Sequence, residues 1–163
     1  MSIEVYNDNY FMKQAYQEAL AAYQEDEIPV GAVVVVNDKI IGRGHNLTER
    51  LQDVTAHAEI QAITAASSYL GAKYLPDCTM FVTLEPCAMC AGALFWSQMG
   101  RVVFGASDPK RGFFLHGGQL HPSTVLEKGL MEKEASNLMK QYFREKRMTT
   151  LYEPWSDLTY CLP

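Results

Sequence analysis

Residues 79–90 read Thr-Met-Phe-Val-Thr-Leu-Glu-Pro-Cys-Ala-Met-Cys, and they are the clearest indication of the fold in the sequence. Its first six residues form an apolar run, which predicts a buried strand over 79–84. Pro86 is welcome at the start of a helix, so we expect a helix to open here. A strand that passes directly into a helix begins a βα unit, and this one places Cys87 and Cys90 at the junction.

The flanking sequence supplies similar elements on both sides. Upstream, the turn Asn37-Asp38 separates two strand-like runs and predicts a hairpin. Helices are predicted from apolar residues at helical spacing and strands from short β-branched runs. We expect helices over about 10–23, from 57 toward 70 and along 135–143, and strands over 30–36, 39–45 and 101–106.

This order of elements predicts an α/β protein with βαβ units beside an initial antiparallel hairpin. The expected architecture is a three-layer α/β/α sandwich. Active sites in such sheets lie at the carboxyl ends of strands, next to helix N-termini. The segment 55–59 and the segment 84–90 both lie at such a junction.

The length of 163 residues fits one domain, which we expect over 1–147. Residues 148–163 form a tail rich in Tyr, Trp and Leu, which we expect to pack on the domain or on a dimer. Hydrophobic residues make up 48% and charged residues 20%, the balance of an ordinary globular protein. The net charge of −5 provides no overall attraction to nucleic acid, although a local basic patch is compatible with it.

The sequence also predicts where the protein works. No run of 18 apolar residues is present, so no membrane span is expected. The first nine residues lack the basic and apolar regions of a secretory signal. Four cysteines without such a signal favour a reducing compartment, and we therefore expect a cytoplasmic protein.

Two short motifs carry the chemistry. Cys87 and Cys90 are three residues apart at a helix start, where both sulfurs can bind one metal ion and the helix N-terminus favours thiolates. His57, at the start of the preceding helix, completes three ligands. A tetrahedral Zn²⁺ with three protein ligands keeps one open position, which is typical of a catalytic site. We expect one zinc ion per chain.

Glu59 is the predicted catalytic residue. Two thiolates neutralise the dication, so the water is acidified less and a carboxylate that takes its proton becomes necessary. Residues two apart on a regular helix diverge by roughly 200°. His57 must therefore lie before the regular part of the helix if its side chain and that of Glu59 are to converge.

A Cys-x-x-Cys pair alone is also typical of a redox pair or of two small core residues. His-x-Glu about thirty residues before Pro-Cys-x-x-Cys is the combination found in zinc deaminases. We therefore predict a zinc-dependent hydrolytic deaminase, with a structural zinc or redox site as the alternative.

Over about residues 10–147 the sequence resembles the bacterial tRNA-specific adenosine deaminases of the cytidine deaminase-like superfamily. The resemblance is carried by four strings: Pro-Val-Gly-Ala-Val at 29–33, Thr-Ala-His-Ala-Glu at 55–59, Thr-Leu-Glu-Pro-Cys-Ala-Met-Cys-Ala-Gly-Ala at 83–93, and Arg-Val-Val-Phe-Gly-Ala-x-Asp at 101–108. It implies a five-stranded mixed sheet, a homodimer, and conversion of adenosine to inosine at the wobble position of a tRNA anticodon loop. By the same resemblance, Asn46, Ala58 and Asp108 bind the substrate.

Other residues leave alternatives open. Lys110, Arg111, Arg144, Lys146 and Arg147 are possible phosphate contacts, but charges at a helix end also favour the helix dipole and solubility. Residues 112–129 are shorter than in the tRNA enzymes, and the tail is aromatic rather than lysine-rich. A free-base or nucleoside deaminase of the guanine, cytosine or cytidine type is therefore the alternative function. A non-catalytic RNA-binding subunit is disfavoured because Glu59 is present.

Overall fold

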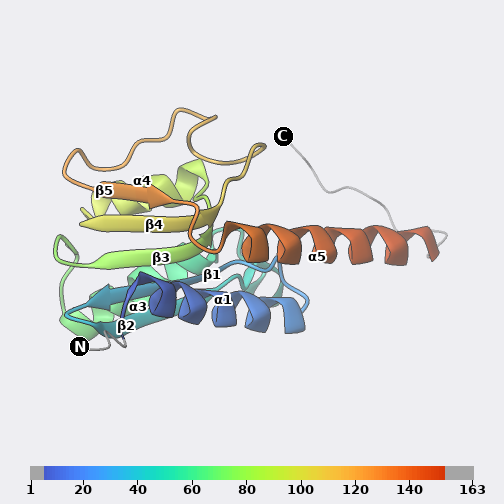
Figure 1. Cartoon of the computed structure of the whole chain (residues 1–163), viewed down its shortest axis with the longest axis horizontal. Coiled ribbons are helices and arrows are strands. Elements are labelled where there is room, and N and C mark those ends of the chain that lie inside the picture. Colours follow the sequence, from blue (N-terminus) through green and yellow to red (C-terminus); the bar gives the residue numbers. More distant parts are fainter. Residues whose placement is uncertain (1–5, 153–163) are drawn as a thin grey trace.

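The computed structural model describes residues 6–152, which form a five-stranded sheet covered by helices on both faces (Figure 1). The strands lie in the order β2-β1-β3-β4-β5. The elements along the chain are α1 (Asp8–Gln24), β1 (Gly31–Val36), β2 (Lys39–His45), α2 (Thr48–Leu51), α3 (Ala58–Leu70), β3 (Thr79–Leu84), α4 (Ala88–Trp96), β4 (Arg101–Ala106), β5 (Val125–Lys128) and α5 (Glu132–Tyr152).

The pairing of the strands places four carboxyl ends at one edge of the sheet. β1 is antiparallel to both β2 and β3, with Gly31 opposite His45 and Ala32 opposite Val82. β3, β4 and β5 are parallel to one another. Consequently β2, β3, β4 and β5 all run in the same direction, and the segments that follow them meet at the same edge. The mixed five-stranded sheet and the α/β/α class are confirmed.

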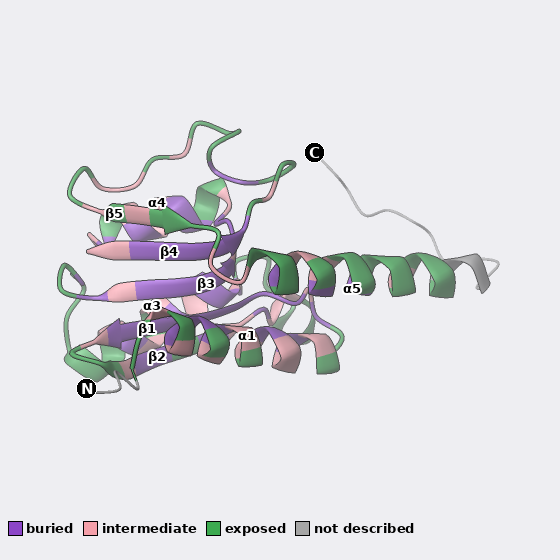
Figure 2. Ribbon diagram, viewed as in Figure 1, coloured by how far each residue is buried: buried purple, intermediate pink, exposed green. Residues whose placement is uncertain are grey.

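The helices divide into two layers. α1 and α5 cover one face of the sheet, and α3 and α4 cover the other (Figure 1). The central strands β1, β3 and β4 are buried nearly throughout (Figure 2). Val33, Phe81 and Val103 point toward α1, whereas Val34, Val82 and Phe104 pack with residues of α3 and α4. Strand residues with alternating orientation thus supply both cores.

Two glycines of β2 allow α3 to lie directly on the sheet. A Cβ atom at Gly42 would lie 2.4 Å from the carbonyl oxygen of Ala62, and one at Gly44 would lie 2.4 Å from that of Ala58. Any side chain there would push the helix away. This close packing positions the N-terminus of α3 beside the carboxyl end of β2.

The structure differs from the sequence prediction in four places. Pro86 precedes α4, which is capped by Cys87, rather than lying in its first turn. The short helix α2 was not predicted, and β5 lies inside the segment 112–129. α5 continues beyond residue 147 to Tyr152, while residues 153–163 of the expected tail lie outside the described part. None of the helices in the described residues is long and apolar enough to cross a membrane.

Candidate metal centre

The metal centre lies where two helix N-termini meet at the carboxyl edge of the sheet. His57 is the N-cap of α3 and Cys87 is the N-cap of α4, and both have extended backbone conformations with ψ of 156° and 172°. Because His57 precedes the first helical residue, the direction of its side chain is not fixed by the helical repeat. This meets the condition for convergence with Glu59.

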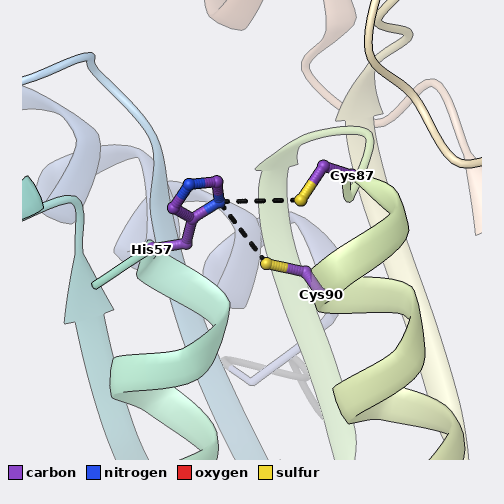
Figure 3. A group of neighbouring side chains, drawn as sticks. All are labelled: His57, Cys87 and Cys90. Carbon is purple, nitrogen blue, oxygen red and sulfur yellow. Dashed lines mark hydrogen bonds between the residues drawn. The ribbon is translucent and has the colours of Figure 1, made fainter. Parts of the chain in front are cut away.

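His57, Cys87 and Cys90 form the one group among the described residues placed to hold a metal ion (Figure 3). The Nδ1 atom of His57 lies 3.7 Å from the sulfur of Cys87 and 3.5 Å from that of Cys90. Ordinary Zn–N and Zn–S bond lengths at a tetrahedral angle require an N···S separation of about 3.6 Å. The donor set therefore fits Zn²⁺, with Nδ1 as the ligand atom of the imidazole.

The electrostatics of the cysteines also suit a metal ion. A hydrogen bond from Cys90 lowers the pKa of the Cys87 thiol to about 4. The same interaction, together with burial, raises the pKa of Cys90. The pair thus holds one thiolate readily, and a dication bound between the sulfurs would displace the remaining proton. The pKa of His57 is raised, chiefly through its hydrogen bond with Cys87.

Glu59 lies in the first turn of α3 and is only 3% exposed. Burial raises the pKa of its carboxyl group, although interactions with His57 and Cys90 act in the opposite direction. A carboxylate with a raised pKa accepts a proton more readily than an ordinary carboxylate does. The geometry thus brings a proton-transferring group next to the ligands without making it part of the donor set.

Two predicted substrate contacts are bonded to each other. The backbone N–H of Ala58 donates to the side-chain Oδ1 of buried Asn46 over 3.0 Å. The backbone N–H of Asn46 in turn donates to the carbonyl of Val30. Asn46 therefore connects the end of β2 to the start of α3, next to the N-cap residue His57.

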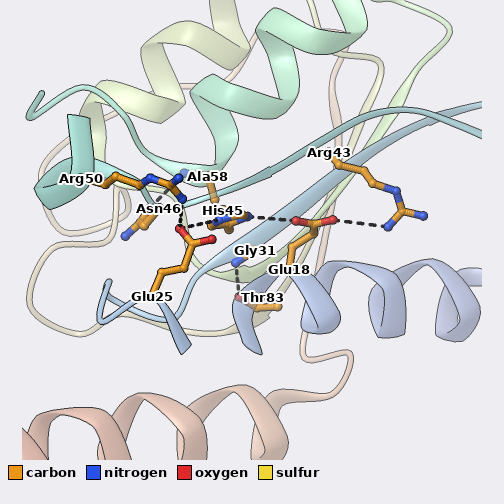
Figure 4. A network of polar contacts seen from close by, with 9 residues as sticks. All are labelled: Glu18, Glu25, Gly31, Arg43, His45, Asn46, Arg50, Ala58 and Thr83. Carbon is orange, nitrogen blue, oxygen red and sulfur yellow. Dashed lines mark hydrogen bonds and ion pairs between the residues drawn. The ribbon is translucent and has the colours of Figure 1, made fainter. Parts of the chain in front are cut away.

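An ionic network anchors the same region to α1 (Figure 4). His45 Nδ1 lies 3.0 Å from Glu18, and His45 Nε2 lies 3.6 Å from Glu25. Arg43 and Arg50 pair with these carboxylates from the outside. The network ties the residue before Asn46 to Glu18 of α1 and to Glu25, the C-cap of that helix, and limits its movement.

The predicted cations occupy two separate places. Lys110 and Arg111 are exposed in the loop after β4, and the charge of Arg111 reaches His57 strongly enough to act on its pKa. Arg144 and Arg147 are exposed on α5, whose second half extends beyond the sheet (Figure 1). Lys146 pairs with Asp26 at the end of α1. Of the five cations, Lys110 and Arg111 belong to the loop beside the metal centre.

The sequence prediction did not single out two buried carboxylates. Glu27 accepts hydrogen bonds from the backbone N–H groups of Glu49 and Arg50 at the start of α2. Glu85 accepts from the backbone of the loop after β4. Both are charged residues at ends of apolar runs, where sequence patterns normally indicate exposure. Only the tertiary structure shows that both carboxylates are buried and bound to backbone N–H groups.

Comparisons with known proteins agree with this geometry. Residues 5–106 match the family model of the cytidine and deoxycytidylate deaminase zinc-binding region. The tRNA-specific adenosine deaminase of Agrobacterium fabrum is 42% identical over 145 residues, covering 85% of this chain and 95% of that protein.

Two solved structures of deaminases superpose on this chain. One, from a study of A-to-I editing by tRNA:A34 deaminases at the wobble position, superposes with a TM-score of 0.74 at 41% identity, covering 79% of this chain and 98% of that one. A guanine deaminase from Bacillus subtilis gives a TM-score of 0.60 at 39% identity, covering 62% of this chain and 65% of that one.

Removal of either cysteine ligand should abolish metal binding. We expect about one zinc ion per chain in protein purified without added zinc, and its loss in Cys87→Ala and Cys90→Ala. Cys78→Ala is the matched control, because this buried cysteine lies outside the cluster and should leave the metal content unchanged. Inductively coupled plasma mass spectrometry measures all four proteins. Stoichiometric iron, or full zinc in both ligand variants, would contradict the assignment.

Proposed function

The chain belongs to the cytidine and deoxycytidylate deaminase family, and we propose that it converts adenosine to inosine at the wobble position of a tRNA. The observation that carries the proposal is the His57, Cys87 and Cys90 cluster with buried Glu59 beside it. Identity of about two fifths over nearly the whole length of a tRNA-specific adenosine deaminase supports the substrate. Editing of tRNA would place the protein in the cytoplasm.

The reaction replaces the exocyclic amine of adenine by oxygen, consuming water and releasing ammonia. His57, Cys87 and Cys90 would hold the zinc ion, which would supply the Lewis acidity needed to activate a water molecule. Glu59 would take one proton from that water and pass it to a ring nitrogen. It would then take the second proton from the oxygen now bonded to the ring and pass it to the amine, which leaves as ammonia. Its burial keeps the proton on this path, because bulk water has little access to the carboxyl group.

Substrate binding is assigned to residues near the metal ligands. Asn46 follows β2 and binds the backbone of Ala58 at the start of α3, and Asp108 lies in the loop after β4. A base inside a duplex cannot reach a recessed metal ion, whereas a wobble base in a loop can be turned outward at low cost. Lys110 and Arg111 lie in the adjoining loop, where they can contact flanking phosphates.

A free-base activity is the second candidate function. The structural similarity to a guanine deaminase at 39% identity favours it, but that similarity covers a smaller share of both chains. Two curated relatives that are 42% identical over 85% and 86% of the chain are named tRNA-specific adenosine deaminases. We therefore place the tRNA substrate first.

We also propose a homodimer formed through α4. Cys90, Ala91 and Leu94 face the core of the chain. On the opposite side, Met89 is 38% exposed and Trp96 is 76% exposed. An exposed apolar helix face of this kind is typical of a protein–protein interface.

Replacement of the buried carboxylate should separate chemistry from metal binding. In Glu59→Ala we expect turnover to fall by at least ~10²-fold, the usual effect of losing a general acid/base. Zinc content and the circular dichroism spectrum should match the wild type, because Glu59 is not a ligand. Glu49→Gln, which removes an exposed carboxylate, should retain full turnover. Loss of zinc in Glu59→Ala would reassign this residue as a ligand.

The substrate is tested by ammonia release from a panel of tRNA anticodon stem-loop, adenosine, guanine and cytosine. We expect the stem-loop to react fastest. Lys110→Gln combined with Arg111→Gln should lower this turnover and reduce its dependence on salt, because two phosphate contacts are lost. The charge-matched control combines Lys133→Gln with Lys140→Gln, both exposed on α5. Rapid turnover of guanine with no reaction of the stem-loop would establish the second candidate instead.

Light scattering at micromolar concentration should give the mass of two chains. Trp96→Glu should shift the protein toward one chain, because a charge would be buried in the apolar contact. Met148→Glu alters a similarly exposed apolar residue on α5 and should leave the mass unchanged. A wild-type protein with the mass of a single chain would exclude the proposed dimer.

A further inference from the structure

Glu85 follows β3 directly, is 6% exposed, and lies outside the group of metal ligands. Its two carboxylate oxygens bind two different points of the loop after β4. The backbone N–H of Asp108 donates to Oε2 over 2.9 Å, and the backbone N–H of Phe114 donates to Oε1 over 3.2 Å. One side chain therefore holds both ends of the segment 108–114.

The middle of this segment is docked on the same stretch of sequence. Gly112 forms a β-bridge with Cys87, and the N–H of Phe113 donates to the carbonyl of Pro86 over 2.9 Å. A Cβ atom at Gly112 would lie 2.2 Å from Oε1 of Glu85, so only glycine allows the carboxylate to occupy this position. The loop is thus fitted around the side chain of Glu85.

A second carboxylate continues the arrangement. Oδ1 of Asp108 accepts hydrogen bonds from the N–H groups of Lys110 and Arg111, each over 3.0 Å. Glu85 holds the backbone of Asp108, and Asp108 holds the two cationic residues. The directions in which Lys110 and Arg111 leave the loop therefore depend on Glu85.

We infer that Glu85 is a positioning residue that sets the substrate-binding conformation of residues 108–114. It acts by holding Asp108, Lys110 and Arg111 beside the metal centre, without contacting the substrate. This inference rests on the proposed function, in which those residues bind the tRNA loop around the reacting base. Loop residues held in advance cost less free energy to order when the substrate binds.

The test is Glu85→Gln, which keeps the size of the side chain. A glutamine amide has one acceptor oxygen, so one of the two loop N–H groups must face an NH2 group and lose its bond. We expect the amides of residues 108–114 to exchange with deuterium about tenfold faster. The KM for the anticodon stem-loop should rise about tenfold while kcat changes less than about threefold, since binding rather than chemistry is weakened. Glu134→Gln removes an exposed carboxylate and is the control.

Gly112→Ala disturbs the contact between Glu85 and the loop from the side of the loop. It provides the test of the inference if Glu85→Gln does not fold. It should give the same rise in exchange and in KM as Glu85→Gln. Unchanged exchange, faster exchange with an unchanged KM, or a fall in kcat alone would each overturn the inference. If the wild-type protein does not deaminate the stem-loop, the proposed function is wrong. The inference is then decided by exchange and by the KM of whichever base the wild type deaminates.

Discussion

The metal site requires two thiol sulfurs to lie close to one imidazole nitrogen, and they do so at 3.7 and 3.5 Å, near the N···S separation of about 3.6 Å in tetrahedral zinc sites. Two helix N-termini must meet for this, because His57 caps α3 and Cys87 caps α4. The meeting is possible because β2 and β3 end at the same edge of the sheet. Gly42 and Gly44 then allow α3 to lie against β2 with no side chain between them.

Buried carboxylates, in addition to apolar packing, hold α2 and the segment 108–114. Glu27 binds the start of α2 on one side, and Glu85 binds the segment 108–114 on the other. Backbone N–H groups bound to a carboxylate form stronger hydrogen bonds than neutral pairs do. Loops can therefore border an open substrate site and still keep a defined shape.

In the proposed function, the reacting residues and the contacts to flanking phosphates lie in different parts of the molecule. The ligands and Glu59 lie on helix starts that are supported by the sheet. Asp108, Lys110 and Arg111 lie in a loop, where changes of length and sequence disturb the core least. The fold is shared with tRNA:A34 deaminases and with a guanine deaminase. This is consistent with the division, because the same hydrolytic step removes the amino group from either base.

The central strands and the metal ligands could be predicted from the amino-acid sequence alone. β2, β3 and β4 begin and end at the predicted residues, because apolar runs bounded by turn and helix signals are local features. β5 was missed because Val125–Lys128 is short and largely exposed, so it carries no apolar run. The bond between Asn46 and Ala58 and the role of Glu85 were decided by the tertiary structure alone. Hydrogen bonds between residues far apart in the chain leave no periodic pattern, and a charged residue can be buried only where the fold delivers its donors.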